Sequence, residues 1–189
     1  MKLCNGSARR ETHSVAGWSI VEILIGLTVI AFIFLISSPV INTLTQKHSM
    51  TKTSGNLLTS LTLAQEEASR RRVKARVCPS SDGSSCRADG NWNRGWLVFM
   101  DSNANSKPEA SEILERYGPA DEIVRIQAHG AFAHHATFNV NGAPELEGNS
   151  SKGSFRICFA DGEPGFQEVQ INVDGWVEAR KSDLTCLET

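Results

Sequence analysis

The chain has 189 residues, of which 40% are hydrophobic and 21% charged, and this composition excludes a disordered or collagen-like protein. Its 19 Lys and Arg residues and 21 Asp and Glu residues leave a net charge of −2, so the overall charge does not indicate nucleic-acid binding. The apolar residues are unevenly spread, because Ile20 to Ile41 is a nearly unbroken apolar run in which Glu22 is the single charge. This distribution argues against a purely cytosolic enzyme.

The apolar run is long enough to cross a membrane as a helix. It has 22 residues, and a spanning helix needs about 20. Lys2, Arg9 and Arg10 precede the run and the next Lys or Arg is Lys47, which predicts a cytoplasmic N-terminus and an external C-terminal part. A cleaved secretory signal is the alternative, but the run is too long for one and no A-x-A-like site follows it. We therefore expect a single-pass membrane protein.

The residues around the start of this run, Ala-Gly-Trp-Ser-Ile-Val-Glu at 16–22, resemble the processing site of type IV prepilins. The resemblance implies that a prepilin peptidase cuts after Gly17 and methylates the new amino group of Trp18, which stands where the family usually has Phe. It also implies that Glu22 neutralises the Trp18 ammonium of a neighbouring subunit in a filament. Pro39 stands where pilins carry a helix-bending proline.

Beyond the apolar run, the pattern predicts that the helix continues to about Lys74. Leu57, Leu61, Ala64 and Ala68 recur at spacings of four, three and four residues, which places them on one helical face. We expect that face to be buried against a folded domain.

From Arg76 onward the sequence changes to short β-like runs separated by turn residues. The expected strands are residues 96–100, 113–117, 123–127, 136–140, 154–159, 168–173 and 176–180. The expected tight turns are Asp82-Gly83, Asn141-Gly142, Asp161-Gly162 and Asp174-Gly175. The predicted fold class is α+β: a long N-terminal helix, transmembrane in its first half, packed on a small and mostly antiparallel β domain. The expected parts are a leader (1–17), a transmembrane and filament-core helix (18–41), an amphipathic helix half (42–75) and a periplasmic β-rich domain (76–189).

The chain contains five cysteines: Cys4, Cys78, Cys86, Cys158 and Cys186. Cleavage after Gly17 removes the first and leaves an even number, which suits disulfides in an oxidising compartment. Four cysteines allow three pairings, and proximity in the sequence favours Cys78–Cys86 and Cys158–Cys186. A zinc site is the alternative, but the sequence has no C-x-x-C spacing.

Several segments together resemble the GspH/FimT family of minor pilins and pseudopilins. They are Leu63–Ala68, Val77–Cys86, Asn91-Trp92, Gly95–Asp101, Ser154–Cys158 and Val173–Val177. The resemblance covers residues 16–186 and implies a pilin-like fold, no enzymatic activity and no cofactor. It also implies a role as a minor type IV pilin that helps to initiate or cap pilus assembly.

The same resemblance implies the location and the partners. The protein is expected in the bacterial inner membrane, with its C-terminal domain in the periplasm, and in the pilus after assembly. Implied partners are the prepilin peptidase, other minor and major pilins or pseudopilins, an inner-membrane assembly platform, an assembly ATPase and a secretin. The cysteine loop and the Gly95-Trp96 segment favour the pilus branch. The minor pseudopilin H of type II secretion is the first alternative.

A pilus-tip DNA-binding subunit for natural transformation is the second alternative. Its candidate contacts are Arg70, Arg71, Arg72, Arg180 and Lys181, because clustered cations bind phosphates. Family members that bind DNA do so through a Gly-Arg-x-Arg stretch before the last cysteine. Here residues 175–181 keep only the final Arg-Lys pair and include an acidic Glu178, which disfavours DNA binding.

Residues 101–112 have the oxygen spacing of an EF-hand calcium loop. The oxygen-bearing side chains at loop positions 1, 3, 5 and 12 are Asp101, Asn103, Asn105 and Glu112. Ser106 replaces the glycine of the sharp turn and Lys107 adds a positive charge, so a polar loop joining two strands is the alternative.

Catalytic motifs are missing from the sequence, which has no Ser–His–Asp arrangement, Gly-rich phosphate loop or H-E-x-x-H motif. His129, His134 and His135 have no carboxylate or cysteine at metal-ligand spacing, so an exposed turn is the expected setting of the last two. We predict neither catalysis nor a metal ligated by these histidines.

Overall fold

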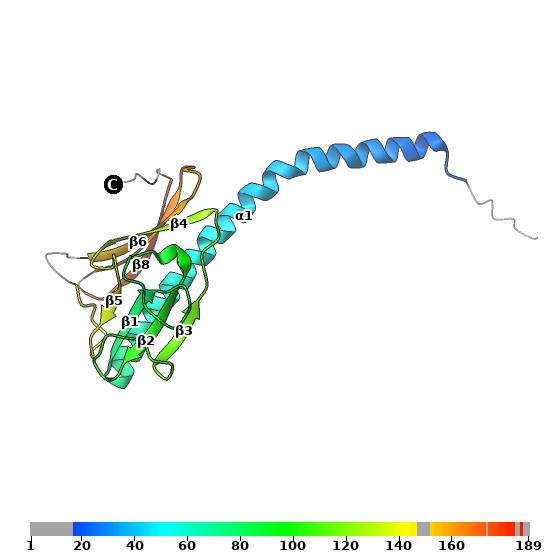
Figure 1. The fold of residues 1–189 in the computed structure, drawn as a ribbon. Helices are drawn as coiled ribbons and strands as arrows, with labels where there is room; N and C mark the ends of the chain where they lie inside the picture. The colour runs from blue at the N-terminus through cyan, green and yellow to red at the C-terminus, as the bar shows by residue number, and fades with distance from the viewer. Residues whose placement is uncertain (1–16, 147–151, 173, 184–185, 187–189) are drawn as a thin grey trace, which may run out of the picture. The chain divides into compact units, whose positions relative to one another are not determined.

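The computed structural model describes residues 17–146, 152–172, 174–183 and 186, and of residues 35–44 it describes the backbone alone (Figure 1). Residues 1–16 of the predicted leader, which include Cys4, and the side chain of Pro39 therefore lie outside the described residues. The chain divides into two compact units, Met1–Asn42 and Thr43–Thr189. One helix, α1 (Ile20–Arg71), contributes residues to both units.

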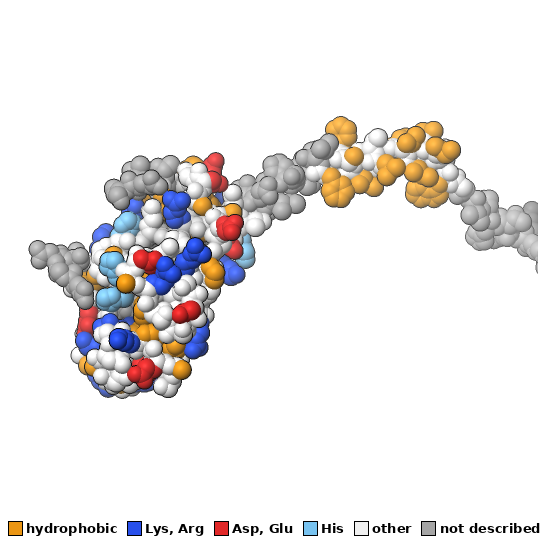
Figure 2. Space-filling view, in the orientation of Figure 1, with side chains coloured by type: hydrophobic (Ala, Val, Ile, Leu, Met, Phe, Trp, Pro, Cys, Tyr) orange, Lys and Arg blue, Asp and Glu red, His pale blue; other side chains and the backbone are white. Residues whose placement is uncertain are grey.

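The first unit contains the N-terminal part of α1, whose apolar side chains are exposed (Figure 2). Ile20 is 77% exposed and Phe34 is 74% exposed. Within the described part of the chain, none of the helices combines the length and the apolarity needed to cross a membrane.

In the second unit, α1 buries the face that its spacing predicts, because Leu57, Leu61, Ala64 and Ala68 are fully buried. The helix ends at Arg71 and not near Lys74 as predicted. Arg72 takes a left-handed backbone conformation, with φ of 58°, and this conformation stops the helix.

Among its described residues, the rest of the second unit forms two four-stranded sheets in which every pairing is antiparallel. The first sheet has the order β3-β2-β1-β5: β3 (Ile113–Tyr117), β2 (Trp96–Asp101), β1 (Lys74–Pro79) and β5 (Ala136–Phe138). The second has the order β4-β6-β7-β8: β4 (Val124–Gly130), β6 (Lys152–Phe159), β7 (Phe166–Asn172) and β8 (Val177–Ser182). A short 3-10 helix, η1 (Trp92–Arg94), precedes β2. The predicted α+β class with antiparallel sheets is confirmed.

Strand β1 is absent from the sequence-based prediction, which expected helix as far as Lys74. Ala75 and Val77 of this strand point into the core, while Arg76 between them is only partly buried. The prediction also made the strand beginning at Ala136 two residues too long, because Asn139 bonds across a turn to Ala143. All four predicted turn glycines have positive φ: Gly83, Gly142, Gly162 and Gly175.

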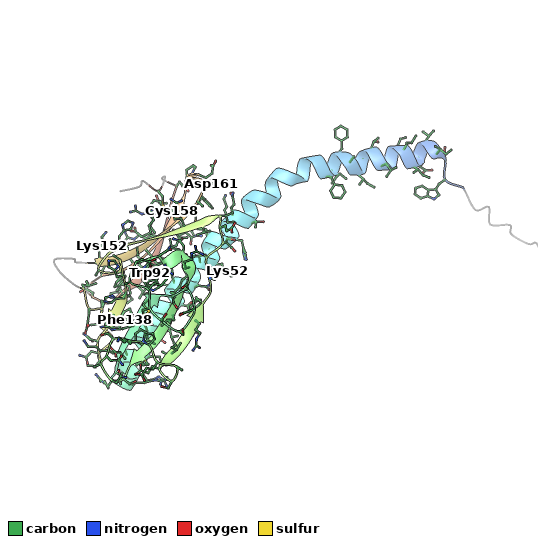
Figure 3. The ribbon with its side chains drawn as sticks, viewed as in Figure 1. Lys52, Trp92, Phe138, Lys152, Cys158 and Asp161 are labelled. Atoms are coloured by element: carbon green, nitrogen blue, oxygen red, sulfur yellow. A yellow bond between two sulfur atoms is a disulfide. The ribbon has the colours of Figure 1, made fainter. Side chains whose placement is uncertain are left out.

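One apolar core joins the second half of α1 to both sheets. Trp96 of β2 donates from Nε1 to Ser60 Oγ of the helix at 2.8 Å, and Gln167 of β7 donates to Thr51 Oγ1 at 3.1 Å. Figure 1 shows this half of the helix running alongside the strands. Trp92 lies inside the domain (Figure 3), where its ring meets Phe155 edge-on at 4.6 Å between centroids. The core and these two hydrogen bonds therefore fix the helix to both sheets.

Candidate functional site

The predicted processing site lies where α1 begins. Gly17, Trp18 and Ser19 precede the helix, and Trp18 is 75% exposed. Ser19 starts the helix: its carbonyl accepts from the Glu22 amide at 3.0 Å and its Oγ accepts from the Val21 amide at 3.4 Å. Glu22 lies in the first turn, where the helix dipole favours a negative charge.

A set of exposed apolar side chains follows, on Trp18 and on the first part of α1, and we call it the apolar helix surface. Its members are Trp18, Ile20, Val21, Ile23, Leu24, Ile25, Leu27, Val29, Ile30, Phe32, Ile33 and Phe34. Their exposed fractions run from 48% to 77%. Exposed apolar surface on this scale marks a membrane or protein contact.

A disulfide from Cys78 to Cys86 closes a small loop after β1. Asp82 organises this loop, because its carboxylate accepts from the amides of Ser84 at 2.8 Å and Ser85 at 2.9 Å. These amide hydrogen bonds hold the pKa of Asp82 well below its ordinary 3.8. The loop is therefore held by both a covalent bond and a carboxylate turn.

The second disulfide joins Cys158 of β6 to Cys186 near the C-terminus. It closes a longer segment, with 28 residues of sequence separation against 8 in the first. These two bonds are the pairings that proximity in the sequence favours.

The candidate DNA contacts are divided between two elements and are largely paired with acids. Arg70 and Arg71 at the end of α1 both form ion pairs with Glu67. Arg180 on β8 pairs with Glu178 at 2.9 Å. In addition, Arg72 donates to Asn141 Oδ1 at 2.8 Å, and Lys181 lies on β8. The pairing with Glu67 and Glu178 reduces the charge available to a phosphate backbone.

The histidines occupy two different settings. His129 lies on β4, where burial and then the nearby Arg156 lower the pKa of its imidazole from the ordinary 6.5. His134 and His135 line a cavity of about 360 Å³ beside the first disulfide. In the described ranges, no group of three or more His, Cys, Asp or Glu side chains is placed to hold a metal ion.

One exposed residue was not singled out as a site from the sequence. Trp176 follows the Asp174-Gly175 turn between β7 and β8 and is 77% exposed. The turn itself is tied to α1, because Gln65 Nε2 donates to the Gly175 carbonyl at 2.9 Å. The sequence did offer a signal for this exposed residue, because a large aromatic side chain directly follows a turn glycine.

These features define a class: a long helix whose first part exposes apolar side chains and whose second part packs on antiparallel sheets is a pilin-like fold. Residues 53–175, about two thirds of the chain, match the family described as Type II transport protein GspH. The chain therefore belongs to the GspH family, and the predicted GspH/FimT-type pilin or pseudopilin is confirmed.

Two solved structures share this fold at low sequence identity. The type IV minor pilin FimU of Pseudomonas aeruginosa superposes with a TM-score of 0.54 at 17% identity, over 75% of this chain and 96% of FimU. The minor pseudopilin EpsH from the Type 2 Secretion System of Vibrio cholerae superposes with a TM-score of 0.52 at 12% identity, over 70% of this chain and 96% of EpsH. No curated protein sequence gives a significant match.

Proposed function

We propose that this protein is a minor type IV pilin, inserted in the inner membrane with its N-terminus in the cytoplasm and its β domain in the periplasm. A prepilin peptidase removes residues 1–17, and the processed chain joins other minor pilins to initiate or cap a filament. The observation that carries the proposal is the apolar helix surface, which begins directly after Gly17. Membership of the GspH family supports it.

The side chains of the apolar helix surface are exposed among the described residues, so we expect lipid or other subunits to cover them. Before assembly, lipid covers this surface and removes its apolar side chains from water. In the filament, the same surface packs against the helices of neighbouring subunits. Glu22 then lies in apolar surroundings, where an unpaired carboxylate is costly, and the amino group of Trp18 on a neighbour is its partner.

Processing is tested with a matched pair of glycine substitutions. A Cβ added at Gly17 or at Gly26 meets no atom within 4 Å, so neither change disturbs packing within the chain. We expect Gly17→Ala to keep the leader and Gly26→Ala to lose it, as measured by the mass of the N-terminal peptide in membranes of the producing bacterium. Cleavage of Gly17→Ala at the wild-type position would contradict the proposed site.

The role of Glu22 is tested by Glu22→Gln, which keeps the shape of the side chain and removes its charge. We expect normal processing but loss of the subunit from sheared filaments, measured by immunoblotting. Glu66→Gln, an exposed position in the second half of the same helix, is the control and should be incorporated normally. Equal incorporation of both variants would refute the pairing with Trp18.

Two machines use subunits of this fold, and the choice between them depends on partners. The closed Cys78–Cys86 loop, together with the Gly95-Trp96 segment, favours the pilus branch. The family description favours the alternative, a minor pseudopilin H of type II secretion. We therefore propose the pilus first and the secretion system second.

Crosslinking in living cells decides between them. A photoreactive amino acid at position 176 replaces a side chain that is 77% exposed, and one at Arg70 provides a second exposed position. Capture of minor pilins, identified by mass spectrometry, is the expected result. Capture of secretion pseudopilins from both positions would move the protein to the type II secretion system.

A further inference from the structure

The connection between β2 and β3, which we call the 101–112 loop, begins and ends with a buried carboxylate. The side chain of Asp101 is 2% exposed, and Glu112 is 8% exposed. The amide of Met100 donates to the Glu112 carbonyl at 2.9 Å, so the two ends of the loop lie together. Burial of two carboxylates at one place requires cations or hydrogen-bond donors nearby.

The donors present do not satisfy both groups. Glu112 turns its carboxylate into the loop, because Oε1 accepts from the Ser102 amide at 2.9 Å. Its other oxygen, Oε2, is buried and has no hydrogen-bond partner among the described residues. Asp101 Oδ2 is 3.5 Å from Nε of Arg76, and that Nε makes no hydrogen bond within the described part of the chain. Among the described residues, the loop therefore contains a buried carboxylate oxygen that accepts no hydrogen bond.

Amide hydrogen bonds shape the rest of the loop around its side-chain oxygens. Asp101 Oδ1 accepts from the Ser106 amide at 3.1 Å, and Asn103 Oδ1 accepts from the Asn105 amide at 3.1 Å. Asn105 Oδ1 accepts from the Lys107 amide at 2.7 Å. Ser106 has φ of 62°, the left-handed conformation for which an EF-hand uses glycine. Ser106 therefore makes the sharp turn, although the sequence has serine where an EF-hand loop has glycine.

We propose that the 101–112 loop binds one calcium ion. Its ligands come from the positions that an EF-hand loop uses: 1, 3, 5, 7, 9 and 12. The corresponding groups are the side chains of Asp101, Asn103, Asn105, Glu109 and Glu112 and the carbonyl of Lys107. Glu109 Oε1 accepts from the side-chain Nδ2 groups of Asn103 and Asn105, at 2.8 and 3.1 Å, so its carboxylate lies beside two of the other ligands. The three carboxylates are not grouped around one point among the described residues, so we expect calcium to draw them together when it binds.

The ligand chemistry favours calcium over other cations. All six groups offer oxygen, and two of the side chains are neutral amides. A twelve-residue loop can adopt the flexible coordination geometry of Ca²⁺, whereas Mg²⁺ requires a nearly ideal octahedron. Zn²⁺ prefers nitrogen and sulfur ligands, which the loop lacks. Lys107 and Arg76 lower the local negative charge, so we expect a dissociation constant of about 0.1–1 mM, the range of extracellular modules. The bound ion would fix the β2–β3 hairpin, whichever filament the subunit joins.

The test uses the full chain in detergent micelles after removal of metal with a chelator. Titration with CaCl2 in a calorimeter should give saturable binding at one site, and 10 mM CaCl2 should raise the melting temperature by about 3–10 °C. The same concentration of MgCl2 should give less than half of that shift. Absence of saturable calcium binding, or an equal shift with both ions, would overturn the proposal.

Three variants assign the binding to the loop. Glu112→Gln keeps the Oε1 acceptor and should weaken calcium binding at least tenfold, while Glu163→Gln, an exposed carboxylate in another turn, should leave it unchanged. Asn103→Asp adds a charge at position 3 and should tighten binding about tenfold. Because Asn103 is exposed, that variant also provides a test if Glu112→Gln fails to fold. Unchanged affinity in Asn103→Asp would remove the loop as the site.

Discussion

The two parts of α1 are both rich in apolar residues, yet they place those residues in opposite environments. Ile20, Leu24 and Phe34 in the first unit are more than half exposed, whereas Leu57 and Leu61 in the second are fully buried. The difference lies in the pattern, because the first part is apolar on all sides and the second on one stripe. A stripe can be covered by one folded domain, but a helix that is apolar all round needs lipid or several neighbouring helices.

The largest expected effect is the difference in stability between two truncated variants, one with a phenylalanine replaced in each region. Phe155 is fully buried against Trp92 and Phe132, so Phe155→Ala should lower the free energy of unfolding by about 3–5 kcal/mol. Phe32 is 68% exposed, and Phe32→Ala should change it by less than about 0.5 kcal/mol. Urea unfolding of the full chain in detergent, followed by tryptophan fluorescence, measures both. A cost above 1 kcal/mol for Phe32→Ala would mean that the first part of α1 also packs within its own chain.

The disulfides give the next largest effect, and it belongs to the domain alone. For loops with separations of 28 and 8 residues, loop-closure entropy predicts losses of about 3.6 and 2.5 kcal/mol on removal. The double substitution Cys158→Ser with Cys186→Ser should therefore destabilise the domain about 1 kcal/mol more than Cys78→Ser with Cys86→Ser. The same urea experiment compares the two pairs. A larger loss from the shorter loop would show that the Asp82 turn depends on its disulfide for packing as well as for closure.

Much of this fold could be predicted from periodicity, because both regions follow simple patterns. The spacing of Leu57, Leu61, Ala64 and Ala68 predicts the buried helical face, and alternation predicts most of the strands. Strand β1 could not be predicted, since it follows a run of arginines that continue the helical composition. The boundary depends on one backbone conformation at Arg72, which residue type does not specify for a non-glycine residue.

Some features of the candidate sites could be predicted from the sequence, and others depend on tertiary structure. The processing motif around Gly17 and the EF-hand spacing from Asp101 could be predicted, because each depends on residues close together in the sequence. The buried, partnerless oxygen of Glu112 is not, since it depends on how β2 and β3 enclose the loop ends. The pairing of Arg70 and Arg71 with the single carboxylate of Glu67 also depends on side-chain conformations that spacing leaves open.

The smallest expected effect is a pH dependence that also belongs to the domain. Burial and Arg156 hold the pKa of His129 below 6.5, and its Nε2 has no hydrogen-bond partner among the described residues. The folded state therefore keeps this imidazole neutral where the unfolded chain already binds a proton. Stability should fall as the pH is lowered from 6.5 towards the folded-state pKa, with a slope of at most about 1.4 kcal/mol per pH unit.

The variant His129→Gln tests this pH dependence. The free energy of unfolding of each protein is compared with its own value at pH 8, because there the imidazole is neutral in both the folded and the unfolded state. The variant should lose less stability than the wild type between pH 8 and pH 5.5. The negative charge of Glu168 on β7 raises the pKa of His129 and so opposes the effect of Arg156, and Glu168→Gln should therefore steepen the loss. Identical pH profiles for His129→Gln and the wild type would mean that the His129 imidazole is as accessible to solvent in the folded state as in the unfolded chain.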